Sequence, residues 1–169
     1  MSLGSYKQRD IETYISGPLS DNISARVAAI SSANDGDRIN DFNGSDANAE
    51  ENHALRVVFN FNPTDTLQLN LNLHGGVDRS DFKQGKPRGT NAFGYTDPHP
   101  NDKKRLNFNA KSQHYGDTHG FSLTANWDLG GAVLKSITAF EKANTDYCGD
   151  IDHSPTSLDE ICFITDGEQ

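Results

Sequence analysis

Uncharged hydrogen-bonding side chains recur at every second position of one short segment. Leucines occupy alternate positions over 67–73, and Gln68, Asn70, Asn72 and His74 stand between and after them. Successive side chains of a strand point to opposite faces, so this segment has one apolar face and one amide-rich face. The outer face of a soluble sheet is usually charged, and these amides therefore raise the question of which solvent lies on each side.

A second set of candidate residues is basic and lies in the polar segment 75–102. Its basic and aromatic residues include Lys83, Lys86, Arg88, Phe82, Phe93 and Tyr95. Cationic groups beside aromatic rings suit an anionic ligand. We therefore take the three cations Lys83, Lys86 and Arg88 as ligand-facing candidates.

Two weaker patterns could bind a metal ion. His114 and His119 are five residues apart, and Asp117 between them is the nearest third ligand. Two exposed loop histidines are the favoured interpretation. The Asp/Asn cluster over 34–46 fails the EF-hand spacing, because a glycine at position six would place Ile39 at position one. We expect a solvated loop there, and no metal site.

Enzyme signatures are absent from the sequence. It contains no GxSxG elbow, HExxH, P-loop or GxGxxG. Carboxylates are abundant but scattered through the polar segments, so no general acid and base can be paired. We expect no enzyme activity and no cofactor.

Composition limits the partners of the chain. It has 169 residues, a net charge of -9, 34% apolar residues and a mean hydropathy of -0.70. Nucleic-acid binding needs clustered Lys and Arg, so this acidic balance argues against it. No run of about 18 apolar residues exists, which excludes a transmembrane helix. The composition remains compatible with strands of a membrane β-barrel, because such strands alternate apolar and polar residues and therefore have a low mean hydropathy.

Cys148 and Cys162 are close in sequence and lie in an Asp-rich segment. A disulfide in an oxidising compartment is favoured over two free thiols. It would close a loop of about 15 residues, worth on the order of 3 kcal/mol in the chain-entropy model. Zinc is disfavoured, because neither a CxxC nor a nearby His pair completes a site.

Period-2 alternation predicts an all-β fold: an antiparallel up-and-down meander of about six strands, forming a partial β-barrel. The expected strands cover residues 6–16, 22–31, 53–61, 64–76, 104–127 and 132–142, with a bend or break of the fifth at 115–117. Turns and long loops alternate, with long segments over 32–52, 75–102 and from 147 onward. Alternate connections of a meander lie at opposite ends of the sheet, so one end should be tight and the other should carry the loops. Segments this long are usually functional or disordered.

The chain then divides into three parts. Residues 1–3 read like an added expression start, 4–146 form the barrel segment, and 147–169 form a polar loop or tail with the disulfide. Phe61 and Trp127 each stand next to a short turn, where a barrel places interfacial aromatic residues. The alternative is that these aromatic residues close the end of a soluble core.

Several segments together resemble TonB-dependent outer-membrane receptors. The matching pieces are ISGPLSD (15–21) before ARVA (25–28), DG with IN (35–40), FNPTDTL (61–67) and WDLG through LKSITAFE (127–141). They occur in the order of the early barrel of that family. The resemblance implies a bacterial outer-membrane parent that imports a scarce solute, such as a ferric siderophore, with lipid and the TonB system as partners. The plug, the TonB box and most of the strands that it implies are absent from the sequence given.

The resemblance also implies places for the candidate residues. Arg56, Gln68, Asn70, Asn72 and His74 would line a watery lumen. The basic loop and the segment 147–167 would meet an extracellular ligand, and an anionic iron chelate would suit the basic loop. The alternative is a soluble β-sheet or small β-barrel that binds a ligand, with these residues on its solvated surface. An isolated segment is also expected to self-associate through its open sheet edges.

Overall fold

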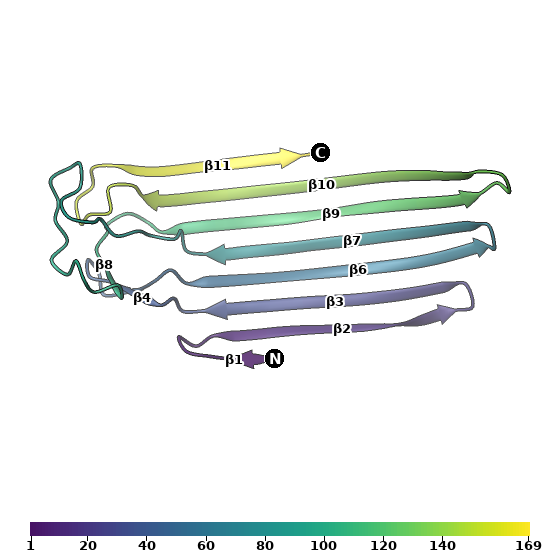
Figure 1. Ribbon diagram of the computed structural model, residues 1–169, viewed down its shortest axis with the longest axis horizontal. Helices are drawn as coiled ribbons and strands as arrows, with labels where there is room; N and C mark the ends of the chain where they lie inside the picture. The colour runs from purple at the N-terminus through teal and green to yellow at the C-terminus, as the bar shows by residue number, and fades with distance from the viewer.

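The chain folds entirely into strands and loops. The computed structural model describes residues 1–169 and contains no helix (Figure 1). A membrane-spanning helix is thus absent as well. The strands are β1 (Ser2–Leu3), β2 (Arg9–Ser20), β3 (Ile23–Asn34), β4 (Arg38–Asn40), β5 (Asp46–Ala47), β6 (Glu50–Thr64), β7 (Leu67–Ser80), β8 (Arg105–Leu106), β9 (Gln113–Asp128), β10 (Val133–Asp150) and β11 (Glu160–Glu168).

Eight strands form one open antiparallel sheet in the order β1-β2-β3-β6-β7-β9-β10-β11. Each long strand pairs with the long strands before and after it along the chain, which is the predicted up-and-down meander. The two outer strands are not paired with each other, so the sheet is a barrel sector that does not close. The all-β antiparallel prediction is confirmed, with β11 as a long strand beyond the six expected.

Connection lengths alternate between the two ends of the sheet. Two-residue turns join β2 to β3 and β6 to β7, and residues 129–132 join β9 to β10. The long connections 35–49, 81–112 and 151–159 all emerge at the opposite end, on the left of Figure 1. This asymmetry follows from the meander, as expected from the sequence.

Several predicted boundaries are wrong. β2 continues through Gly17 and Pro18, where a turn was expected, because its outer side is free and Pro18 need not donate to a further strand there. β9 begins only at Gln113 and passes Gly116 without a break, since β7 and β10 pair with it on both sides. β10 extends to Asp150, so the expected tail from 147 is partly strand.

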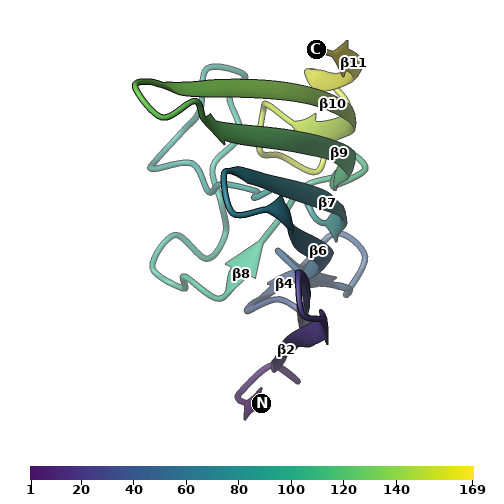
Figure 2. The same cartoon turned by 90° about the vertical axis from the view of Figure 1, so that its right-hand side faces the viewer.

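The sheet is a single layer with two different faces. Leu69, Leu71 and Leu73 lie beside Ala125, Leu123 and Phe121 on what we call the apolar face. The intervening side chains form the polar face. Neither face is covered: only 16 of 169 residues are buried, and Phe121 is 39% exposed. Figure 2 shows one curved layer seen along its strands, with the long loops to one side.

Pairing also resolves strand β10, where the sequence places Lys135 on the same side as Val133 and Ile137. Lys135 lies opposite Asn126 and therefore on the polar face. β10 contributes Leu134, opposite Trp127, and Phe140, opposite Phe121, to the apolar face. Lys135 thus does not interrupt the apolar face.

Candidate functional site

Three loops pack together at one end of the sheet and form what we call the loop cap (residues 35–49, 81–112 and 151–159). β4 of the first loop pairs with β5 on one side and with β8 of the second loop on the other, in a three-stranded sheet. Its buried apolar cluster consists of Ala47, Leu106 and Phe108. Asn40, 1% exposed, donates from Nδ2 to the carbonyl of Phe108 at 2.9 Å. The Asp/Asn cluster of the first loop thus includes a buried tie to the second loop, where a solvated loop was expected.

Lys86 closes a sub-loop of the cap. Its Nζ donates to the carbonyls of His99, Asp102 and Arg105 at 2.6, 2.8 and 2.9 Å. The carboxylate of Asp97 lies 3.2 Å away, and the two side chains are 11% and 4% exposed. An ammonium group has three protons. All three are used within the loop, so the structure places this predicted ligand contact in a structural role.

The other two predicted cations differ from each other. Lys83 pairs with Glu50 and donates to the carbonyl of Asn48 at 3.1 Å, which ties the cap to the end of β6. Arg88 is exposed and makes no side-chain hydrogen bond or ion pair within the chain. Arg88 is therefore the member of the predicted basic set that is free to meet a ligand.

Amides form a short ladder across the polar face near the turn end. Asn70 donates from Nδ2 to Asn60 Oδ1 at 2.6 Å. Both residues line a shallow hollow of about 370 Å³ together with Gln68, Asn62 and Asn126. Its lining consists mainly of amides, so this part of the face can exchange hydrogen bonds with water or a polar solute.

One row of the polar face links Arg56, His74 and Glu141. Arg56 lies opposite His74, which lies opposite Gly120, and Gly120 lies opposite Glu141. His74 Nε2 reaches across β9 to both carboxylate oxygens of Glu141, at 2.8 and 2.9 Å. A Cβ on Gly120 would collide with that carboxylate and with the Phe140 carbonyl. Because Gly120 has no side chain, His74 on β7 can contact Glu141 on β10 across β9.

Asn72 stands next to this row on the same face. Its Nδ2 lies 3.4 Å from His74 Nδ1, and its Oδ1 is buried without a hydrogen-bond partner. The sequence-predicted residues of β6 and β7 thus share one face, as their alternation required. They do not converge on one point, because they extend along the strands.

A hollow of about 360 Å³ lies on the polar face between this row and the cap. Gly76, Gly116 and Ala54 leave space at its floor. The polar residues that line it are Ser32, Asn52, His53, Asp78, His114, Thr118 and Thr145. Hydroxyl, amide, carboxylate and imidazole groups surround the space, so it can hydrogen-bond to a small polar solute.

The two histidines considered as metal ligands cannot act together. His114 and His119 lie in the same strand, five residues apart. An odd spacing in a strand places side chains on opposite faces. His114 faces the polar hollow, whereas His119 borders Leu55 and Phe121 on the apolar face.

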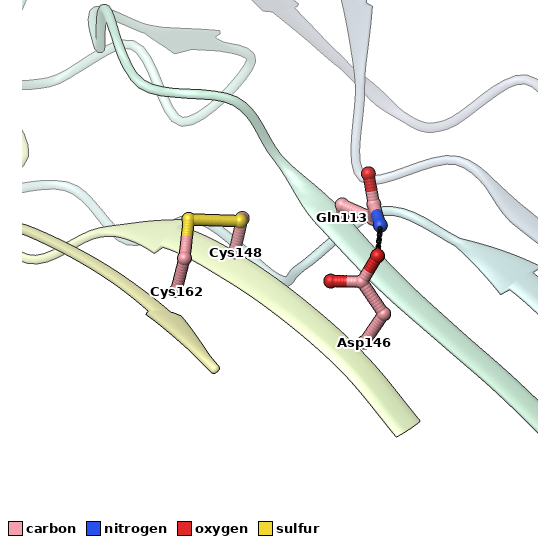
Figure 3. Close-up of a disulfide and its surroundings, with 4 residues drawn as sticks. All are labelled: Gln113, Asp146, Cys148 and Cys162. Atoms are coloured by element: carbon pink, nitrogen blue, oxygen red, sulfur yellow. Dashed lines mark hydrogen bonds between the residues drawn. A yellow bond between two sulfur atoms is a disulfide. The ribbon is translucent and has the colours of Figure 1, made fainter. Parts of the chain in front are cut away.

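The predicted disulfide is present at the base of the cap (Figure 3). Cys148 and Cys162 lie directly opposite each other in the β10–β11 register. Figure 3 also shows the Gln113 amide pointing to Asp146, to which it donates at 2.5 Å. These contacts fasten β11 and β9 to the loop end of β10.

Sequence reasoning missed two buried carboxylates at the end of β10 and in the third loop. Asp150 and Asp152 are 0% and 2% exposed. Burial raises the pKa of the Asp150 carboxyl above its ordinary value, and the charge of Asp152 acts in the same direction. The available signal was the alternation Asp150, Asp152 and Ser154, which places three oxygen-bearing side chains at every second position.

The fold and its two faces define an open sector of an up-and-down β-barrel with all its long loops at one end. Comparison with solved structures finds a matching chain, the siderophore receptor PirA from Acinetobacter baumannii, with a TM-score of 0.60 and 16% sequence identity. The match covers 94% of this chain and 24% of the receptor, so this chain spans about a quarter of that length. No family model and no curated protein matches the sequence. The likeness supports the fold of a receptor barrel.

Proposed function

We propose that this chain is a wall segment of an outer-membrane receptor whose parent protein binds and imports a scarce solute, such as a ferric siderophore. The observation that carries the proposal is the uncovered sheet with one apolar and one amide-rich face. A soluble sheet buries its apolar face against a second layer. Lipid on one side and a watery lumen on the other would satisfy both faces as they stand.

The length of the apolar face supports a bilayer as its partner. Residues 67 to 77 of β7 present Leu or Val at all but one odd position, the exception being Gly75. Ten residues of strand extend about 33 Å. A tilt of about 40° projects this to about 25 Å, which is the height of the lipid-facing band of outer-membrane barrels.

Aromatic residues stand at both limits of this face. Trp127 and Tyr115 lie on the apolar side of β9, twelve residues apart, and they are 48% and 40% exposed. Phe61 accompanies Trp127 at the turn end. Trp and Tyr favour the two interfaces of a membrane because one part of each ring system is apolar and another hydrogen-bonds.

Strand direction supports a longer parent. β2 and β11 form the two edges of the set of long strands, and both run from the loop end to the turn end. Because β2 and β11 run in the same direction, an antiparallel barrel can close between them only through an odd number of further strands. The total would then be even, as in bacterial outer-membrane barrels. In an isolated segment, the same two open edges would favour self-association.

The loop cap supports the ligand part of the proposal. Arg88 offers a free cation, and Phe93 in the same loop is 48% exposed. A free planar guanidinium suits the carboxylate or phosphate-like groups of an anionic chelate. Arg56 and His74 would continue this polar surface along the lumen wall. We propose no catalytic role for any of these residues.

Sedimentation velocity with and without detergent tests the proposal. We expect the chain to be monodisperse in detergent micelles and to self-associate when detergent is removed, because the apolar face and two strand edges become unprotected. A stable detergent-free monomer with a single cooperative melting transition would contradict the receptor proposal. That result would support the soluble ligand-binding sheet instead.

A further inference from the structure

Three aromatic rings stand side by side on the polar face at the foot of the cap. His114, Tyr147 and Phe163 lie opposite one another in the register of β9, β10 and β11. The rings of Tyr147 and Phe163 stack with their centroids 4.7 Å apart, and the His114 ring lies 5.9 Å from that of Tyr147. His114 is exposed, and Phe163 is 45% exposed. We call these three rings the aromatic shelf, and part of its surface is free.

Packing of the cap accounts for only one ring of the shelf. Phe82, from the second loop, packs against Tyr147 with ring centroids 4.6 Å apart. A Cβ on Gly149 would collide with the Phe82 ring, so the glycine lets this loop approach β10. Tyr147 thus has a structural role, whereas His114 and Phe163 keep aromatic surface that the cap does not cover.

The shelf borders the polar hollow of about 360 Å³ described above. His114 belongs to both, and Thr145 lines the hollow two residues before Tyr147 on the same side of β10. The volume lies near the lower end of the range of about 300–1,000 Å³ for small-molecule sites. One continuous surface therefore offers aromatic rings next to hydrogen-bonding groups.

Most hydrogen-bonding groups of the hollow are unused within the chain. The side chains of Asn52, His114, Thr118 and Thr145 make no hydrogen bond within 3.5 Å. Asp78 accepts a backbone N–H through Oδ1 at 2.9 Å, and its Oδ2 has no partner. No Lys or Arg lines the hollow. A carboxylate without a neighbouring cation disfavours an anionic solute, so the hollow suits a neutral one.

We propose that the hollow and the aromatic shelf bind a sugar ring of a neutral, soluble saccharide. The C–H groups on the face of a pyranose ring are slightly positive and suit the negative face of an aromatic ring. Its hydroxyl groups both donate and accept, which matches Asp78 as an acceptor and Thr118 and Thr145 as donors or acceptors. The proposal goes beyond the receptor proposal, because an anionic chelate would bind at Arg88 in the cap and not here.

Titration of the full chain with a panel of neutral saccharides tests the proposal. The panel consists of maltotriose, cellobiose, lactose, mannobiose and sucrose, and the micelles are of lauryldimethylamine oxide, which has no sugar headgroup to compete. Saturation-transfer NMR and calorimetry should detect binding of at least one member with a Kd on the order of 1 mM, since a shallow site covers about one ring. Citrate, as the anionic probe, should not displace the bound saccharide.

Two variants locate the site. Thr118→Val keeps the shape of the side chain, removes its hydroxyl and should weaken binding at least about threefold. Thr124→Val is the matched control: the same change on the same side of β9, six residues nearer the turn end and outside the hollow, should leave Kd unchanged within about 1.5-fold. Phe163→Leu keeps apolar bulk but loses the ring face, and should weaken binding about threefold to tenfold.

Hydrogen exchange of the wild-type chain provides a readout that does not depend on variant folding. The bound saccharide should slow exchange at residues 114–118 and 145–147 and leave the turn at 65–66 unchanged. No binding of any panel member at about 20 times the expected Kd would overturn the proposal. Equal effects of Thr118→Val and Thr124→Val would also overturn it. Either result would leave the receptor proposal standing, because that proposal is tested by sedimentation and does not depend on this hollow.

Discussion

Lys86→Met tests whether Lys86 is a structural residue of the loop cap, as its contacts indicate, or a ligand contact, as its position in a basic loop suggested. The substitution keeps the length of the side chain and removes the ammonium group. It leaves three carbonyls without their donor and Asp97, whose side chain is 4% exposed, without its cation.

The carboxylate dominates the expected effect. Removing one partner of a buried ion pair costs about 3–5 kcal/mol, because the remaining charge is desolvated and unpaired. Each abandoned carbonyl adds up to about 1–3 kcal/mol where water cannot replace the donor. We therefore expect Lys86→Met to destabilise the cap by at least about 3 kcal/mol. Arg88→Met, two residues away and without partners, should change stability by less than about 0.5 kcal/mol.

Hydrogen exchange by mass spectrometry over residues 86–105 measures the opening free energy of this sub-loop directly. Asp97→Asn in the Lys86→Met background should recover roughly 1–3 kcal/mol, since it removes the unpaired charge. Equal protection of the Lys86→Met and Arg88→Met chains would refute the reasoning. So would a double variant that is less stable than Lys86→Met alone.

Three further predictions concern the sheet and its junction with the cap. Leu71→Lys on the apolar face should destabilise the chain in lipid vesicles by about 2–4 kcal/mol, whereas Asn72→Lys on the polar face should destabilise it by less than about 1 kcal/mol. Denaturant unfolding of both variants in vesicles would show this difference between the faces. Reduction of the Cys148–Cys162 disulfide should lower the stability by about 3 kcal/mol and loosen β11 first. Hydrogen exchange would show this as early exchange of the β11 amides, and unchanged protection would contradict a role of the disulfide in fastening that edge. Burial raises the pKa of the Asp81 carboxyl above its ordinary 3.8, so the folded state binds the proton more tightly than the unfolded state. The free energy of unfolding should therefore fall as pH rises from 3.8 to the raised pKa. Asp81→Asn should flatten this slope, and an unchanged slope would rule out Asp81 as its source.

Much of the sheet could be predicted from local patterns. The alternation of Leu69, Leu71 and Leu73 with amides identified the two faces, and the alternation of short and long connections identified the two ends. Strand boundaries were less predictable. Gly116 and Pro18 read as interruptions, yet both lie inside strands, because pairing with neighbours decides where a strand ends. The disulfide was predicted correctly from the closeness of the two Cys residues in sequence and their polar setting.

The residues of the candidate site show the same difference between what a local pattern predicts and what tertiary contacts decide. Arg56, Gln68, Asn70, Asn72 and His74 share the predicted face because a period of two requires it. The roles of the basic-loop cations depended on which carbonyls and carboxylates the fold brings to each ammonium group. That information is spread over distant residues and leaves no local pattern.

The sequence by itself determined a meander with one apolar face, one amide face and loops gathered at one end, since these properties follow from residue period and connection length. Only the tertiary structure decided that the loops form a cap with its own core. It also decided that Gly120 lets His74 reach Glu141, and that Asp150 and Asp152 are buried together. Such contacts join residues far apart in the chain, and their energies depend on burial and on neighbours that exist only after the strands have paired.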